Sequence, residues 1–254
     1  MLRLDRLVIA GVIAFGLCAA ASATEHAHWS YGSGKGPKEW AALSEENRLC
    51  GAGHQQSPID LQERKASSMA DQDAAIHFGK VAGKMVNNGH TLQVDVSDGA
   101  QHTIAFKGAD YQLAQFHFHT PSEHHFDGKS FPMEMHLVSK DSGGRITVVG
   151  VFIKAGKQNE VLAPLFANLP GSEGASHDVE VDLAALMPPS HKAFVYSGSL
   201  TTPPCSESVN WVVLEQPIEM SSKQIRAFQK LFRDNHRPVQ SINGRKVVEE
   251  SVDL

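Results

Sequence analysis

The sequence predicts a single, mainly β domain with a few short helices. Most of the chain consists of short β-type runs separated by turn signals, and only two segments place apolar residues at helical spacing. The 254 residues are 41% hydrophobic, enough for a substantial core, and no Pro/Gly/Ser-rich linker divides them into parts of unlike composition. We therefore expect one globular domain.

The predicted strands follow from the alternation of apolar and polar residues. Leu92, Val94 and Val96 alternate with polar residues directly after an Asn88-Gly89 turn signal, as expected of a half-buried strand. Further strands are predicted over residues 102–106, 113–119, 133–138, 146–153 and 209–214.

Two helices are predicted. Residues 159–169 place leucines and a phenylalanine at helical spacing before Pro170, and Ser221 with Gln224 forms a capping-box start for a second apolar stripe. Because helical segments are so few, we expect them to decorate a β fold rather than build it.

The first segment has the features of an export signal. Arg3 and Arg6 precede an apolar run over residues 7–20, and Ala21-Ser22-Ala23 has the small-x-small pattern that signal peptidase cuts. The alternative is a transmembrane anchor, which requires about 20 apolar residues, more than this run provides. The sequence predicts a signal peptide over residues 1–23 and a mature domain over residues 24–254. That domain would be exported, to the periplasm in a Gram-negative bacterium and otherwise outside the cell.

The cysteine content agrees with export. Cys18 lies within the predicted signal, and Leu17 before it argues against a lipid-attachment site, which requires a small residue there. The mature chain then keeps Cys50 and Cys205, which form either one disulfide in an oxidising compartment or a pair of buried thiols.

Charge excludes some classes of partner. The formal net charge is -5 and the Lys and Arg residues are scattered, so no basic face is available for a nucleic acid. We expect no membrane contact once the signal is removed. The sequence leaves the oligomeric state open and is compatible with a homodimer.

The most informative stretch is Gln115-Phe116-His117-Phe118-His119. Side chains alternate along a strand, so the glutamine and both histidines share one face, while the phenylalanines point into a hydrophobic layer. Glu134 and His136 share a face of the next predicted strand in the same way. If the two strands pair, His117, His119 and His136 form a three-histidine site.

Three histidines suit catalytic zinc. Neutral imidazoles leave the double charge of Zn²⁺ intact, and three protein ligands leave a fourth tetrahedral position for water. Gln115 and Glu134 each stand two residues before a histidine on the same face, which makes them candidate hydrogen-bond partners for the second ring nitrogens.

Two alternatives compete with this zinc site. A lone His-x-His pair is more often structural than metal-binding. His117, His119 and Glu123 also resemble the first metal motif of cupins, which would imply iron or manganese. The glycine that a cupin places six residues before its first histidine is Tyr111 here, which argues against that alternative.

Four motifs occur in order along the chain. They are Phe116-His117-Phe118-His119, Ser122-Glu123-His124, Glu134-Met135-His136-Leu137-Val138 and Ser199-Leu200-Thr201-Thr202-Pro203-Pro204-Cys205. Together they strongly resemble the signatures of alpha-class carbonic anhydrases. The likeness extends from His28-Trp29-Ser30-Tyr31-Gly32 to Arg237-Pro238-Val239-Gln240 and so covers nearly the whole mature chain.

The resemblance implies a role for each matching residue. The three histidines would bind one Zn²⁺ per chain. Thr201 would donate a hydrogen bond to Glu123 and accept one from zinc-bound hydroxide, which directs the nucleophile at the substrate, and Thr202 would line the same wall. His90 would be the proton shuttle, a role suited to the ordinary pKa of histidine near 6.5; the alternative is a solvated loop histidine.

The resemblance also implies a substrate pocket, a fold and a disulfide. The fold would be one large, twisted, mostly antiparallel central sheet, and Cys50 would pair with Cys205. The residues of the carbon dioxide pocket would be Val138, Val148, Leu200, Thr201, Thr202, Val209 and Trp211.

The predicted function is therefore reversible, zinc-dependent hydration of carbon dioxide to bicarbonate and a proton, with weak ester cleavage as a by-product. One rival is a non-catalytic zinc-binding or carbohydrate-binding relative, which usually lacks a zinc histidine; all three are present here. A second rival is a zinc hydrolase acting on esters or phosphates. No carboxylate is placed as an extra metal ligand and no second-metal cluster stands out, which disfavours it.

Overall fold

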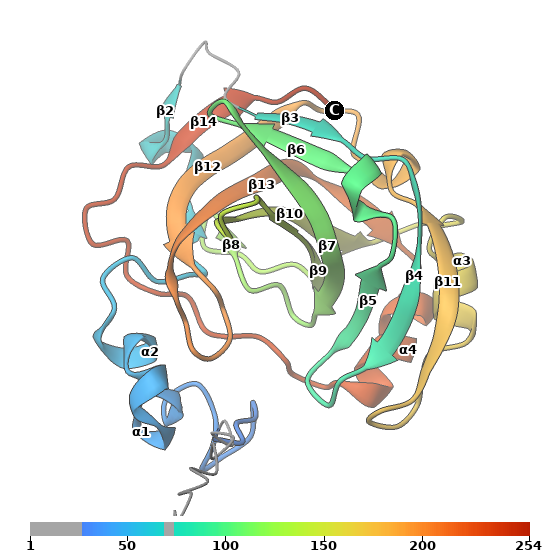
Figure 1. Cartoon of the computed structure of the whole chain (residues 1–254), viewed down its shortest axis with the longest axis horizontal. Helices are drawn as coiled ribbons and strands as arrows, with labels where there is room; N and C mark the ends of the chain where they lie inside the picture. The colour runs from blue at the N-terminus through green and yellow to red at the C-terminus, as the bar shows by residue number, and fades with distance from the viewer. Residues whose placement is uncertain (1–26, 69–73) are drawn as a thin grey trace, which may run out of the picture.

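The computed structural model describes residues 27–68 and 74–254, and one large sheet dominates it (Figure 1). The predicted signal peptide and its cleavage site lie outside the described residues. The sheet has twelve strands. They are β2 (Ser67–Ser68), β3 (Ala74–His77), β4 (Lys80–Asn87), β5 (Leu92–Val96), β6 (Thr103–Phe106), β7 (Ala109–His119), β9 (Met133–Lys140), β10 (Ile146–Ala155), β11 (Ser176–Asp182), β12 (Lys192–Ser199), β13 (Glu207–Met220) and β14 (Val248–Ser251).

The strand order along the sheet is β11-β4-β5-β7-β9-β10-β13-β12-β14-β2, and β3 and β6 extend it from β7. Only the pairs β10–β13 and β14–β2 are parallel within it. The prediction of one large, mostly antiparallel sheet is confirmed. A small separate sheet pairs β1 (Asp60–Leu61) with β8 (His125–Phe126).

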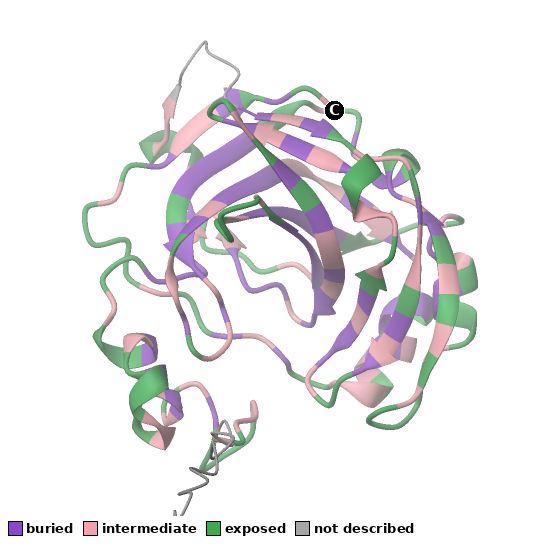
Figure 2. Ribbon diagram, in the orientation of Figure 1, coloured by how far each residue is buried: buried purple, intermediate pink, exposed green. Residues whose placement is uncertain are grey.

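The two faces of the sheet carry separate apolar clusters. On β7, Phe116 and Phe118 enter the larger cluster, where Phe118 contacts Phe166 and Phe228 with ring centroids 5.4 and 6.1 Å apart. Figure 2 shows buried residues along the central strands and exposed ones on the outer segments. The opposite face of the central strands is free to build a polar site above a second, smaller cluster that includes Trp211.

Helices are few and short, as predicted. They are α1 (Trp40–Leu43), α2 (Leu49–Ala52), α3 (Ala163–Ala167) and α4 (Ser222–Leu231), with 3-10 turns at Glu45–Asn47, Glu63–Lys65, Gly99–Gln101 and Ala184–Leu186. Helix α4 begins at the expected capping box of Ser221 and Gln224. Helix α3 is shorter than the predicted 159–169, because Oδ1 of Asn159 accepts from the backbone N–H of Leu162 and holds the preceding residues in a turn.

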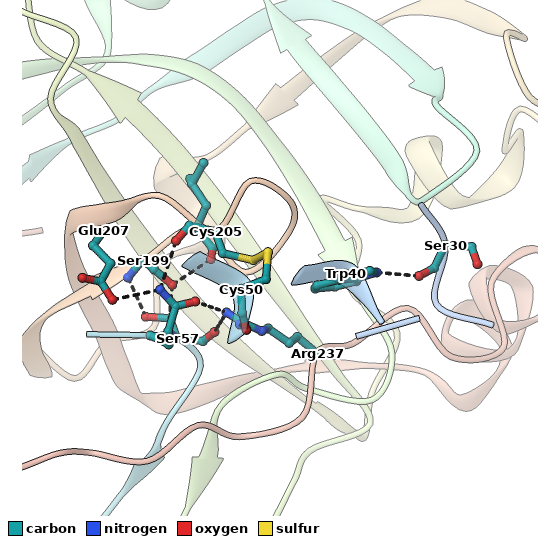
Figure 3. Close-up of a disulfide and its surroundings, with 10 residues drawn as sticks. Ser30, Trp40, Cys50, Ser57, Ser199, Cys205, Glu207 and Arg237 are labelled. Atoms are coloured by element: carbon teal, nitrogen blue, oxygen red, sulfur yellow. Dashed lines mark hydrogen bonds between the residues drawn. A yellow bond between two sulfur atoms is a disulfide. The ribbon is translucent and has the colours of Figure 1, made fainter. Parts of the chain in front are cut away.

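A disulfide joins the N-terminal segment to the loop before β13. Cys50 and Cys205 are bonded across 155 residues, which confirms the predicted pair and excludes two free thiols (Figure 3). The buried guanidinium of Arg237 lies beside the bridge and donates to the carbonyls of Cys50 and Ser57 and to Oε1 of Gln56, each at 2.8 Å. These contacts fix the N-terminal segment against the chain that follows α4.

Within residues 27–68 and 74–254, no helix is both long and apolar enough to cross a bilayer.

Candidate active site

Strands β7 and β9 bring the three predicted histidines together. His117 lies directly opposite His136 in the antiparallel register, and His119 follows two residues later on the same face. The ring centroids are 4.9 Å apart for His117 and His119, 5.3 Å for His117 and His136, and 4.6 Å for His119 and His136. One nitrogen of each ring lies within 4.8 Å of the others, a spacing that a single metal ion can bridge.

The second nitrogen of each ring is held by a hydrogen bond. Nδ1 of His117 donates to Oε1 of Gln115 (2.8 Å), and Nε2 of His136 donates to Oε1 of Glu134 (2.9 Å). Nδ1 of His119 donates to the carbonyl of Asn235 (2.7 Å). The offset of Gln115 and Glu134 predicts the first two contacts. Sequence reasoning missed the partner of His119, because that acceptor is the backbone carbonyl of Asn235, which lies 116 residues away in the chain.

Burial keeps the three imidazoles neutral. It lowers the pKa of His117 well below 6.5, and the neighbouring His119 and His136 lower it further. Burial also lowers the pKa of His119 to about 4 and lowers that of His136. Neutral imidazole is the form that binds a metal ion, so the three rings need not lose a proton when a metal ion binds.

A chain of hydrogen bonds extends behind Glu134. Its carboxylate also accepts from Nδ1 of His124 (2.7 Å) and from the backbone N–H of His124 (2.8 Å). Nε2 of His124 then accepts from the hydroxyl of Tyr196 (2.6 Å), which contacts the hydroxyl of Ser57 at 2.8 Å. Burial alone would raise the pKa of Glu134, but His124 and His136 hold it well below its usual range. The sequence contains His124 in a motif but gives no indication of this bridging position.

Glu123 is fully buried beside the histidines. Its Oε1 accepts from the backbone N–H of Arg237 at 2.7 Å. Its Oε2 lies 3.6 Å from Nε2 of His119, and neither atom has a hydrogen-bond partner among the described residues. Burial raises the pKa of this carboxyl group, and His136 opposes the rise most, followed by the hydroxyl of Thr201 and the backbone N–H of Arg237. Thr201 therefore lies next to Glu123, as predicted.

These features test whether the site fits a metal ion. Three neutral imidazole nitrogens lie close enough to share one ion, and a hydrogen bond to the second nitrogen of each ring fixes its orientation. Nε2 of His119 is buried and has no hydrogen-bond partner among the described residues. The donor set suits Zn²⁺, which binds imidazole nitrogen in tetrahedral sites and is commonly held by three protein ligands in enzymes. The three histidines therefore fit a Zn²⁺ ion.

A cavity of about 240 Å³ opens over the histidines. Of the predicted substrate residues, all but Val209 line it; Val209 is buried in the same apolar cluster as Val138, Val148 and Trp211. The cavity is lined by Gln115, His117, His136, Val138, Lys140, Ile146, Val148, Leu200, Thr201, Thr202 and Trp211. Lys140 and Ile146 were not predicted, although both lie at the open end of the strands that carry Val138 and Val148.

His90 lies outside this lining, in the turn between β4 and β5. Its ring stacks on Trp29, with centroids 3.7 Å apart and planes inclined by 8°. Its carbonyl accepts from Nδ2 of Asn235 (3.1 Å), the residue whose own carbonyl holds His119. Burial lowers the pKa of His90, His28 lowers it further, and Glu173 opposes them. Sequence reasoning assigned no role to Trp29.

Comparison with known proteins decides the family. Residues 35–251 match the profile described as eukaryotic-type carbonic anhydrase. The chain belongs to the alpha-class carbonic anhydrase family. It is 39% identical over 235 residues to a carbonic anhydrase of Pectobacterium carotovorum, covering 91% of this chain and 95% of that protein. It is 40% identical over 228 residues to one of Nostoc, covering 87% and 86%.

Solved structures agree. The alpha-carbonic anhydrase of Thermovibrio ammonificans, in complex with the inhibitor sulfanilamide, has a TM-score of 0.84 and 42% identity, covering 88% of this chain and 99% of that one. Dioscorin complexed with ascorbate has a TM-score of 0.82 at 27% identity, covering 89% and 99%. Since the second protein has a different name and ligand, the fold alone does not assign an activity.

The family match, together with the fold, makes this chain a carbonic anhydrase, a lyase whose small-molecule substrates are carbon dioxide and bicarbonate. Alpha-class carbonic anhydrases depend on zinc, and the histidine cluster offers donors for it. The cupin alternative is wrong, because the match extends over most of the chain and the sheet is not a cupin barrel.

Proposed function

We propose that this chain hydrates carbon dioxide reversibly to bicarbonate and a proton, with one Zn²⁺ held by His117, His119 and His136. The observation that carries the proposal is the free nitrogen on each ring: all three lie within 4.8 Å of one another, while the opposite nitrogens are engaged. When bound, Zn²⁺ supplies a nucleophile at neutral pH, an effect for which carbonic anhydrases are themselves the standard example.

Glu123 and Thr201 would orient the nucleophile. Because Oε1 of Glu123 already accepts from the backbone of Arg237, the unpartnered Oε2 is available to accept from the hydroxyl of Thr201. A hydroxyl that donates its only proton in this way must accept, rather than donate, a hydrogen bond on its other side. Thr201 would then select the orientation in which a lone pair of the nucleophile faces the substrate.

The apolar wall of the cavity would receive carbon dioxide. Val138, Val148, Leu200 and Trp211 line it beside His117 and His136. Carbon dioxide has no net charge to anchor it, so an apolar wall next to the nucleophile is the environment that suits it. Val209 would act by packing against the residues of this wall. Weak ester cleavage would follow from the same nucleophile.

His90 would carry the released proton to buffer. Two observations support this role: Asn235, whose carbonyl holds His119, also donates to the carbonyl of His90, and His90 is half-buried. An imidazole side chain can accept a proton and release it again in each turnover.

Two variants separate these roles. Thr201→Ala should lower kcat/KM for carbon dioxide by about 10²-fold, because it removes an oriented hydrogen bond from the attack step. His90→Ala should lower kcat and leave kcat/KM nearly intact, and imidazole buffer should restore much of the loss. Steady-state hydration at several buffer concentrations measures both. If His90→Ala lowers kcat/KM tenfold and imidazole has no effect, His90 is structural.

We also propose that residues 1–23 are a signal peptide and that residues 24–254 work as one exported domain. The Cys50–Cys205 disulfide supports an oxidising compartment. Intact mass of the exported protein should show Thr24 as the first residue, and a chain that retains residues 1–23 would contradict the assignment.

A further inference from the structure

The carboxylate of Glu173 lies against the turn that carries His90. A Cβ atom placed on Gly89, the residue before His90, would come within 2.9 Å of Cδ and Oε1 of Glu173. Gly89 also has a φ of +83°, which disfavours any side chain. The close approach of Glu173 therefore depends on glycine at this position.

Hydrogen bonds hold the backbone around Glu173 next to the turn of His90. It is the second residue of a β-turn closed by the bond from Ala175 N to Ser172 O (3.0 Å), with Gly174 at a φ of +79°. Asn87, at the end of β4, connects this turn to the turn of His90 through three hydrogen bonds. The three bonds are Gly174 N to Asn87 O (2.8 Å), Asn87 N to Ala175 O (3.0 Å) and Asn87 Nδ2 to Pro170 O (3.0 Å).

The other charged groups around His90 do not replace Glu173. From the N-terminal segment, His28 faces it with ring centroids 6.3 Å apart, and Trp29 covers one side of the ring. From the segment after α4, Asp234 and His236 flank Asn235 but pair with each other. Glu173 is the one acidic group among the main influences on the His90 pKa, and it acts against both burial and His28.

We propose that Glu173 is a positioning residue for proton export, whose carboxylate stabilises the protonated imidazole of His90. The proposal rests on the proposed shuttle role of His90. Burial and His28 both favour the neutral ring and lower the pKa of His90, and Glu173 acts in the opposite direction. The carboxylate thus favours the protonated form of His90, even though the ring is stacked and partly desolvated.

The test is an NMR titration of His90 in the zinc-loaded protein, with the His90 signal identified by its loss in His90→Ala. Glu173→Gln keeps the size of the exposed side chain and removes its charge. It should lower the pKa of His90 by about 0.3–0.5 unit, the effect expected of one charge several ångströms away in a largely aqueous setting. Glu173→Lys should lower it about twice as far, because the sign of the charge is reversed.

Glu180→Gln is the matched control. Glu180 is exposed on β11 and pairs with Ala82, several residues along the strands from the His90 turn. It should leave the His90 pKa unchanged. If Glu173→Gln behaves like Glu180→Gln, the proposal is wrong.

The pH dependence of kcat separates this proposal from the shuttle role. In Glu173→Gln it should move to lower pH by the same amount as the His90 pKa. If the pKa moves and the kcat profile does not, Glu173 still acts on His90, but His90 is not the group that exports the proton.

Discussion

Replacing Glu134 by Gln tests how the hydrogen bonds behind a ligand control the metal site. The carboxylate accepts three bonds, from Nε2 of His136 (2.9 Å), Nδ1 of His124 (2.7 Å) and the backbone N–H of His124 (2.8 Å). A glutamine has one acceptor oxygen. If that oxygen keeps both imidazole bonds, the new amide N–H₂ faces the backbone N–H of His124, donor against donor.

Two losses follow. A buried donor without an acceptor costs about 1–3 kcal/mol, so the free energy of unfolding of the metal-free protein should fall by about that amount. Loss of the negative charge next to His136 makes its imidazole less basic and so a weaker metal ligand. Such changes typically lower metal affinity by about 10–100-fold. Urea unfolding and competition with a chelator for Zn²⁺ measure the two effects, and Glu180→Gln serves as the exposed control. Zinc affinity within about twofold of wild type, alongside the expected loss of stability, would show that Glu134 only supports the fold and would refute the reasoning.

Two further predictions concern stability. The exported protein should have no reactive thiol when denatured without reductant, and replacing Cys50 and Cys205 by Ser should lower the free energy of unfolding by about 2–5 kcal/mol, measured in urea; two titratable thiols per native chain would contradict the bridge. Burial raises the pKa of Tyr196 in the folded protein well above 10, the usual value for tyrosine. The neutral phenol therefore contributes its full share of the free energy of unfolding below pH 10, and this contribution is lost as the pH rises from 10 toward the pKa in the folded protein. Tyr196→Phe should be less stable than wild type at neutral pH, because Ser57 and His124 lose a partner, and the gap should narrow above pH 10; an equal loss of stability in both proteins with rising pH would argue against this.

Local rules of strand geometry predicted the centre of this site. Alternation along β7 and β9 places His117, His119 and His136 on one face, because side-chain direction on a strand depends only on position within it. The offset of two residues likewise placed Gln115 and Glu134 behind their ligands.

Contacts between distant segments were not predictable in the same way. Asn235 holds both His119 and His90, and Trp29 covers His90, but neither residue is near its partner in sequence. Strand β11 was also missed. It lies at the edge of the sheet, and acidic residues occupy every second position, from Asp178 to Asp182, so its composition resembles a loop. Val209 was expected in the cavity wall but is buried in the apolar cluster that the wall residues share, because strand alternation gives the face of the sheet on which a side chain lies and not its depth.

Stopped-flow hydration of carbon dioxide by the metal-free chain, as Zn²⁺ is added, tests the three-histidine zinc site directly. We expect almost no activity without metal, a linear rise as Zn²⁺ is added, and saturation at one Zn²⁺ per chain, with no such rise in His119→Ala. Full activity in the metal-free chain, or an unchanged titration in His119→Ala, would contradict it.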